Sequence, residues 1–239
     1  DFVKYHETHY IPQKTTVIVA GNVDRKIILK QIKERFSEAK KGKVIKKQKV
    51  KISQKAPAVK IKNKKSDQTH LHLGFHSFKM GDKRNIALGV ARAILGGGMS
   101  SRLFRKMRDE LGMCYYTKAY ISTATDSGNF LVASGVGNAR AEEAVSVIID
   151  EFKKLRDEEI SEKEIKKAKE YLIGNLATSH ETSESWADFY GFQELLRQDI
   201  KTLKELEKEI RAISEKDIKR VLKQVIKKEG LNLAIIGPH

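Results

Sequence analysis

The sequence has little cysteine, no long apolar run and few acidic residues in its first quarter. The single cysteine, Cys114, excludes a disulfide within the chain, so nothing requires an oxidising compartment; this favours the cytoplasm without fixing the location. No stretch of about 18 apolar residues occurs, so we expect no helix that spans a membrane. The first ten residues lack a basic segment followed by an apolar core, which excludes a secretory signal at this position.

Positive charge is concentrated near the N-terminus. The net charge is +16, and residues 1–65 contain 19 Lys and Arg against 5 Asp and Glu, whereas residues 66–239 contain 28 against 26. The densest run, KKGKVIKKQKVKISQK at 40–55, is of a kind that contacts nucleic acid or acidic peptides. It has no interleaved aromatic residues and no nucleic-acid-binding module around it, so we interpret it as a solvated linker and expect no nucleic-acid partner. The abundance of Lys, Glu and Ile is typical of thermophile proteins.

The N-terminal region predicts one strand and one helix. The β-branched run TTVIVAGNV at 15–23 predicts a buried strand, and residues 24–38 predict a helix with Asp24 as its N-cap. Residues 39–56 have no helical pattern and predict an extended linker. TTVIVAGN at 15–22 resembles LNLAIIGP at 231–238, since both are apolar strands stopped by glycine, and this similarity indicates an internal repeat.

The remaining residues predict an α+β domain, with an antiparallel sheet and helices packed mainly on one face. Alternating apolar and polar residues predict strands at 56–64 and 68–78, and further strands follow at 114–123, 128–136 and the C-terminus. Helical spacing predicts helices from 84 to the glycines at 96–98, at 100–111, and over most of 139–227. Ser161 with Glu164, and Ser214 with Asp217, have the spacing of capping boxes.

The most specific pattern is LGGGMSSRLFRKMRDELGMCYYT at 95–117. It comprises a glycine-rich turn, Ser-Arg-Leu, a helix bearing an arginine, a glycine, and a tyrosine seven residues after that arginine. This block resembles the pitrilysin/insulinase family of zinc metallopeptidases, which includes insulin-degrading enzyme and mitochondrial processing peptidase. YHETHYIPQKTTVIVAGNVD resembles the segment that closes the first half of these enzymes, and SDQTHLHLGFHS resembles the strand that opens their second domain.

The resemblance implies that the chain is the C-terminal portion of a zinc endopeptidase. Residues 1–40 would be the tail of the N-terminal peptidase domain, 41–56 a basic linker, and 57–239 the C-terminal peptidase-like domain. The zinc of the intact enzyme would be held outside this chain, which alone would be inactive. Expected partners are a peptide or unfolded protein substrate and an N-terminal peptidase domain or partner subunit, in a homodimer or heterodimer. The alternative is a non-catalytic homologue that acts as a peptide-binding or scaffold subunit.

Three histidine clusters invite a metal, but none has the pattern that a peptidase zinc site needs. YHETHY at 5–10 places His6 and His9 three residues apart, and neither His-x-x-Glu-His nor His-Glu-x-x-His occurs in the sequence. HLHLGFH places His70, His72 and His76 on one face of a strand, where zinc, nickel or copper could bind. HETSE at 180–184 lacks a second histidine. Strand histidines usually pack or face water, and the family does not place its metal in these segments, so we expect no metal ligand here.

Arg108 and Tyr115 are the candidate site residues. Arg108 falls on the last turn of its helix, Gly112 can reverse the chain in a left-handed conformation, and Tyr115 then enters the next strand. Together they supply donors to a peptide carbonyl or to an oxyanion, and the resemblance implies that they contact substrate held near the zinc. The alternative is a structural role, with Arg108 bonded to Asp109 or Glu110. No complete catalytic set is expected in this chain.

For the neighbouring residues of the same block we expect structural roles. We expect Arg102 to pack or form a salt bridge, and Tyr116 to point to the face opposite Tyr115. We expect Cys114 to fill a small buried site. The glycines at 96–98 follow a helix rather than a strand, so they indicate a turn for close backbone packing and not a phosphate-binding loop.

Overall fold

The computed structural model describes residues 1–39, 41–197 and 199–238, which fall into two compact units. The larger unit comprises Lys51–Ala177 and Lys201–His239, and the smaller unit comprises Asp1–Val50 and Thr178–Ile200. Residues 178–200 are thereby grouped with the N-terminal segment, whereas the sequence assigned them to the domain at 57–239. The division at 41–56 stays a prediction, and residues 40, 198 and 239 of the predicted segments lie outside the described residues.

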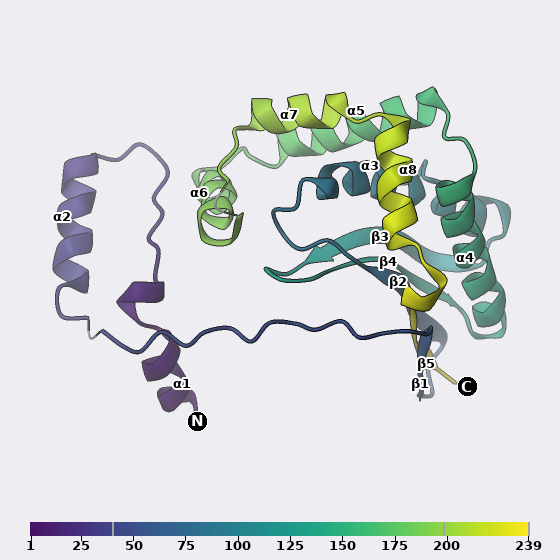
Figure 1. The fold of residues 1–239 in the computed structure, drawn as a ribbon, viewed down its shortest axis with the longest axis horizontal. Helices are drawn as coiled ribbons and strands as arrows, with labels where there is room; N and C mark the ends of the chain where they lie inside the picture. The colour runs from purple at the N-terminus through teal and green to yellow at the C-terminus, as the bar shows by residue number, and fades with distance from the viewer. Residues whose placement is uncertain (40, 198, 239) are drawn as a thin grey trace. The chain divides into compact units, whose positions relative to one another are not determined.

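The larger unit contains a five-stranded sheet with the order β1-β5-β2-β4-β3 (Figure 1). β2 runs antiparallel to both β5 and β4, and β4 runs antiparallel to β3. The strands predicted in this unit are confirmed, but at one edge of the sheet β1 pairs with β5 in parallel. The strands are β1 Ala58–Asn63, β2 Gln68–Ser77, β3 Cys114–Thr123, β4 Gly128–Gly137 and β5 Leu231–Gly237.

Helices cover one face of this sheet, as the predicted α+β class requires (Figure 1). Along β2, Thr69, Leu71 and Leu73 are fully buried while His70 and His72 are exposed, so alternate side chains enter the core and leave the other face open. On the buried side α4 and α8 contact the central strand β2, α4 also contacts β4, and α3 contacts the edge strand β3. α7 contacts α3. These helices are α3 Arg84–Gly96, α4 Ala141–Asp157, α5 Glu162–Thr178, α7 Leu203–Ala212 and α8 Glu215–Val225, with short 3-10 turns at Asn138–Arg140 and Lys228–Gly230.

The helix starts follow from local side-chain bonds. The capping box of α8 is confirmed, because the Ser214 hydroxyl accepts from the Asp217 amide and the Asp217 carboxylate accepts from the Ser214 amide. At the start of α5 the Ser161 hydroxyl accepts from the Glu164 amide and donates to its carboxylate. No helix of the described ranges is both long and apolar enough to cross a membrane.

The smaller unit consists of short helices joined by extended chain. Asp24 caps α2 by accepting from the amides of Lys26 and Ile27, as predicted. The Gln13 side chain makes two hydrogen bonds with Gly42, and the Ile18 side chain lies against Gly191. The helical elements are α1 Phe2–His9, η1 Pro12–Lys14, α2 Arg25–Phe36, α6 Ser183–Phe192 and the π-helical η4 Gln193–Arg197.

The predicted buried strand at 15–23 is wrong. These residues form no strand, and Val17 and Val19 are 45% and 46% exposed. The physical reason is that a strand needs a neighbour to accept its main-chain hydrogen bonds and a layer to cover its apolar face. The described residues of the smaller unit contain no strand, and they cover this segment only in part, since Ile18 is half-buried against Gly191. Ile28 and Ile32 on α2 are also half-buried.

Candidate functional site

The structure brings Arg108 and Tyr115 together at the edge of the sheet. A π-helical segment, η2 (Phe104–Glu110), carries Arg108, and Gly112 follows with a φ of +56° that reverses the chain as predicted. The Arg108 guanidinium donates a hydrogen bond to the main-chain carbonyl of Tyr115. Both side chains are exposed, and Tyr115 is 65% accessible.

The π-helix fixes the direction of Arg108. The Leu111 amide donates to the carbonyl of Lys106, five residues back, over 3.1 Å, which is the spacing of a π-helix. Met107 is fully buried, and the Thr117 hydroxyl lies 3.6 Å from its sulfur, so this side of the segment is anchored against β3. Arg108, the next residue, is exposed, with its guanidinium carbon 5.5 Å from the centre of the Phe104 ring.

Within the described part of the chain, Arg108 forms no ion pair with Asp109 or Glu110, the two residues of the structural alternative. The carboxylate of Glu110 forms an ion pair of 2.8 Å with Lys106. Arg108 instead uses a neutral carbonyl, which leaves its positive charge and its other N–H donors available to a ligand. The adjacent Cys114 is buried as expected. Burial raises the pKa of its thiol above the usual value, and the positive charge of Arg108 offsets part of this increase.

A β-bulge at Tyr115 changes the expected direction of Tyr116. The pairing of β3 with β4 shifts between Cys114 and Tyr116, so Tyr115 is an extra residue without an opposite partner. Cys114 and Thr117 are buried, and both residues between them are exposed. The expectation that the two tyrosines point to opposite faces is therefore wrong, because the bulge interrupts the alternation and leaves both on the solvent side.

The open face of the sheet carries two histidine–tyrosine pairs that the sequence did not predict. His70 Nδ1 lies 3.0 Å from the phenol oxygen of Tyr116, and His72 Nδ1 lies 3.0 Å from that of Tyr120. The His70–Tyr116 pair reaches across β4 at a glycine, since a Cβ on Gly135 would lie 2.4 Å from the Tyr116 ring. The His72–Tyr120 pair crosses β4 diagonally, where His72 is paired with Ala133 and Tyr120 with Leu131. Burial, and secondarily the neighbouring Tyr116, raise the pKa of Tyr120. The spacing of four residues between Tyr116 and Tyr120 indicates in the sequence that both lie on one face of a strand. Their histidine partners could not be identified from the sequence, because β2 lies two strands away from β3.

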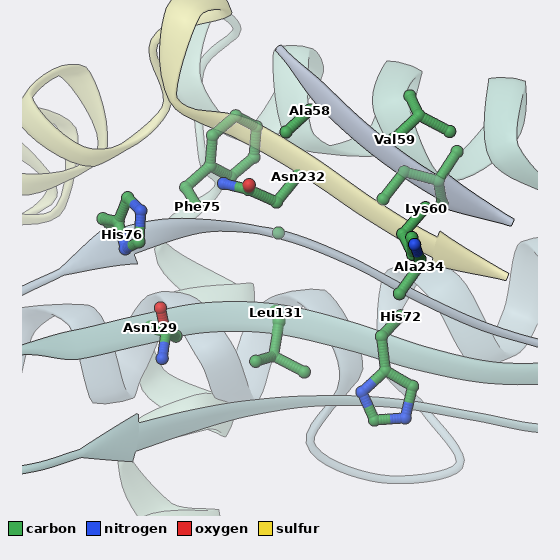
Figure 2. Close-up of a pocket in the computed structure, with 12 residues that line it drawn as sticks. Ala58, Val59, Lys60, His72, Phe75, His76, Asn129, Leu131, Asn232 and Ala234 are labelled. Carbon is green, nitrogen blue, oxygen red and sulfur yellow. The ribbon is translucent and has the colours of Figure 1, made fainter. Parts of the chain in front are cut away.

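A shallow cavity of about 390 Å³ lies on the same open face, and Gly74 of β2 is among its lining residues. Figure 2 shows that its lining comes from four strands: Ala58 of β1, Asn232 of β5, His72 and His76 of β2, and Asn129 and Leu131 of β4. Apolar walls with a few polar tips suit a side chain or a short segment of a peptide.

Arg102 forms a salt bridge, as expected. Its guanidinium makes two hydrogen bonds to the Glu164 carboxylate, at 2.8 and 3.0 Å. The bond from Arg102 holds the pKa of Glu164 below its usual value, and the bond from Glu164 raises the pKa of Arg102. This two-bond ion pair joins the residues just before η2 to α5 and so helps to hold η2, which carries Arg108, in place.

The glycine turn at 96–98 serves close packing, as predicted. A Cβ on Gly96 would lie 2.5 Å from the main-chain nitrogen of Ala119. Only glycine lets the end of α3 approach β3 this closely, so a phosphate-loop role has no support here.

The histidine clusters do not fit a zinc centre. His9 stacks on Tyr5 with ring centres 4.0 Å apart, and His6 stacks on Tyr10 at 4.8 Å. His180 packs in an aromatic cluster with Trp186 and Phe189. Within the described ranges, no three His, Cys, Asp or Glu side chains are grouped so that they could hold a metal ion. We therefore derive no chemical step through a metal in this chain.

Comparison with known sequences identifies relatives along the whole chain. A family model described as the Peptidase M16 inactive domain matches residues 1–172. The chain is 31% identical over 236 residues to "Uncharacterized zinc protease YmxG" of Bacillus subtilis, covering 98% of this chain and 56% of the relative. It is 27% identical to "Uncharacterized zinc protease SCO5738" of Streptomyces coelicolor, covering 98% and 52%. The chain thus spans about half the length of these curated relatives.

Comparison with solved structures shows the same fold. A protease from Helicobacter pylori superposes with a TM-score of 0.90 at 22% identity, covering 98% of this chain and 58% of that one. A peptidase M16 inactive domain from Pseudomonas fluorescens superposes with a TM-score of 0.82 at 19% identity, covering 92% and 52%. The pitrilysin/insulinase resemblance of the 95–117 block is confirmed. The chain belongs to the peptidase M16 family, as its inactive, C-terminal domain.

Proposed function

We propose that this chain is the substrate-holding part of a zinc endopeptidase that hydrolyses peptides or small proteins, and that Arg108 and Tyr115 contact the substrate. The observation that carries the proposal is the anchoring of Arg108 on the Tyr115 carbonyl at the edge strand β3. One donor of the guanidinium fixes its position, and its remaining donors and the exposed phenol of Tyr115 are free to approach a ligand.

The chemistry that suits this arrangement is stabilisation of negative charge on oxygen. A guanidinium and a phenol hydrogen bond to a peptide carbonyl in the ground state, and bind more strongly as that oxygen becomes an oxyanion. A prepositioned arginine loses little freedom when it binds, because the Tyr115 carbonyl already restricts it. The role of these groups is therefore to orient the substrate and stabilise the transition state.

In this proposal the zinc of the intact enzyme is supplied by the part of the protein outside this chain. The matched relatives are called zinc proteases and extend over nearly twice the length of the chain. Zinc held there would supply the Lewis acid and the activated water that peptide hydrolysis needs, while Arg108 and Tyr115 of this chain would orient the peptide. The partner of the chain is then an N-terminal peptidase domain or a partner subunit, and the chain alone is inactive.

The test replaces the two groups in the intact enzyme. Arg108→Ala and Tyr115→Phe should each lower kcat for a quenched fluorescent peptide by about 10²-fold, the effect of losing one oxyanion donor. Arg105→Ala, an exposed arginine of the same helical segment, is the matched control and should keep near-normal turnover. Zinc content and melting temperature should stay unchanged in all three variants. Normal turnover by both Arg108→Ala and Tyr115→Phe would show that the pair is structural.

The second candidate is a non-catalytic homologue that binds a peptide or subunit as a scaffold. The open sheet face with its cavity near Gly74 serves that function without any metal. A parent protein that binds peptide, loses affinity on Arg108→Ala and shows neither bound zinc nor cleavage would favour the scaffold.

A further inference from the structure

The strand β1 has a free edge on the side of the sheet opposite β3. Among the described residues it pairs with β5 alone, in a continuous register from Ala58 with Asn232 to Asn63 with Gly237. Along 58–62 its other edge has no strand beside it among the described residues, and these five residues are exposed. An open edge presents unpaired main-chain donors and acceptors, which can pair with another extended segment.

The two faces of β1 have different chemistry. Val59 and Ile61 are 61% and 55% exposed and are paired in register with Leu233 and Ile235. Lys60 and Lys62 occupy the alternate positions and therefore lie on the other face. An added strand would meet apolar side chains on one face and ammonium groups on the other.

The charge around β1 has one sign. Residues 51–65 contain six lysines and no acidic residue. Lysines on an edge strand oppose pairing between identical copies, because like charges would face each other. The same lysines attract a strand whose carboxylates stand opposite Lys60 and Lys62 while apolar residues lie beside Val59 and Ile61.

We propose that β1 binds an extended segment of a partner protein with alternating acidic and apolar residues, by strand addition at its free edge. The site is distinct from Arg108 and Tyr115, since β1 and β3 are the two outer strands and lie about 19 Å apart at four strand spacings. It does not depend on the proposed peptidase function.

The binding test uses the full chain and synthetic labelled peptides in fluorescence anisotropy titrations. A peptide of alternating Glu and Val, as long as β1, should bind at least about tenfold more tightly than one of alternating Lys and Val. N-methylation of the backbone amides on one edge of the Glu–Val peptide should weaken binding by about tenfold or more, because it removes the pairing donors. Equal binding of the acidic and basic peptides, or of the methylated and unmethylated ones, would overturn the proposal.

Charge reversal then locates the site. Lys60→Glu combined with Lys62→Glu should weaken binding of the Glu–Val peptide by about tenfold and make the Lys–Val peptide the better ligand. The control, Lys163→Glu with Lys166→Glu on the exposed side of α5, makes the same change in net charge and should alter affinity by less than about twofold. Equal losses in both double variants would mean that bulk charge attracts the peptide. Self-association of the chain that neutral substitution, Lys60→Gln with Lys62→Gln, strengthens would identify a second copy as the occupant and overturn the proposal.

Discussion

Two stretches near the ends of the chain have nearly the same residue pattern but different structures. LNLAIIG at 231–237 becomes β5, bonded to β1 on one side and β2 on the other. TTVIVAGN at 15–22 forms no strand, although it is at least as rich in β-branched residues. The difference lies in their surroundings, because β5 has two strands beside it and residues 15–22 lie in a unit whose described residues form none. A strand-like residue pattern shows that a segment can form a strand. Whether it does so depends on the strands available beside it.

The comparison extends to the two units. In the larger unit Leu71, Leu88 and Phe130 are fully buried in a single core, whereas in the smaller unit Ile11 is the most buried of its apolar side chains among the described residues. We propose that residues 15–22 pair with strands of the part of the protein that the relatives carry beyond this chain.

Limited proteolysis should show the largest difference between the units. Cleavage of the isolated chain should begin within 39–56 and leave a stable core of about 20 kDa, because residues 56–239 contain the sheet and opening it costs the global free energy of unfolding. Mass spectrometry of the fragments identifies the cut sites. First cleavage within 84–136, with residues 1–40 protected in a monomer, would show that the division at 41–56 is wrong.

Shortening one apolar side chain in each unit should show the difference in packing between the two units. Leu73→Ala removes a fully buried side chain from β2 and should lower the free energy of unfolding by about 2–5 kcal/mol. Val17→Ala removes a half-exposed side chain in the smaller unit and should change it by less than about 0.5 kcal/mol. Chemical denaturation measures both. Equal losses would mean that residues 15–22 contribute to the same core.

Low pH should give the smallest effect, and again only in the larger unit. Arg102 lowers the pKa of Glu164 in the folded state, so the pair stabilises the fold above the unfolded pKa of about 4.5, and this stabilisation is lost as pH falls through the lower folded pKa. At pH 7 Glu164→Gln should cost about 1 kcal/mol or less, since the pair is partly exposed. Glu34→Gln removes the exposed partner of Lys30, 3.9 Å away, and should cost almost nothing. Indistinguishable pH profiles for the wild type and Glu164→Gln would contradict the assignment.

The parts of the fold that the sequence predicted are those set by local chemistry. Alternation in QTHLHLGFHS predicts β2 because the burial of Leu71 and Leu73 repeats every two residues. Asp24 and Ser214 predict helix starts because a cap needs only the next three amides. The left-handed conformation of Gly112 could also be predicted from the sequence, because the turn depends on only a few neighbouring residues.

The parts that could not be predicted depend on residues far apart in the sequence. The bulge at Tyr115 is defined by the residue pairing between β3 and β4, which the sequence of β3 alone does not show. The parallel pairing of β1 with β5 joins positions more than 170 residues apart. The contact of His70 with Tyr116 requires a glycine on the strand between them. The sequence indicated Arg108 and Tyr115, but not the carbonyl that receives the arginine, because a π-helix sets that direction.

The most direct test of the central claim measures zinc and peptide cleavage together, in the purified 239-residue chain and in the full-length protein. The account predicts no stoichiometric zinc and no cleavage of a quenched peptide by the chain alone, because no His-x-x-Glu-His occurs in it, and one zinc with cleavage in the full-length protein. Metal analysis by mass spectrometry and a fluorescence assay on the same samples give both values. One tightly bound zinc per isolated chain, accompanied by proteolysis, would contradict the account.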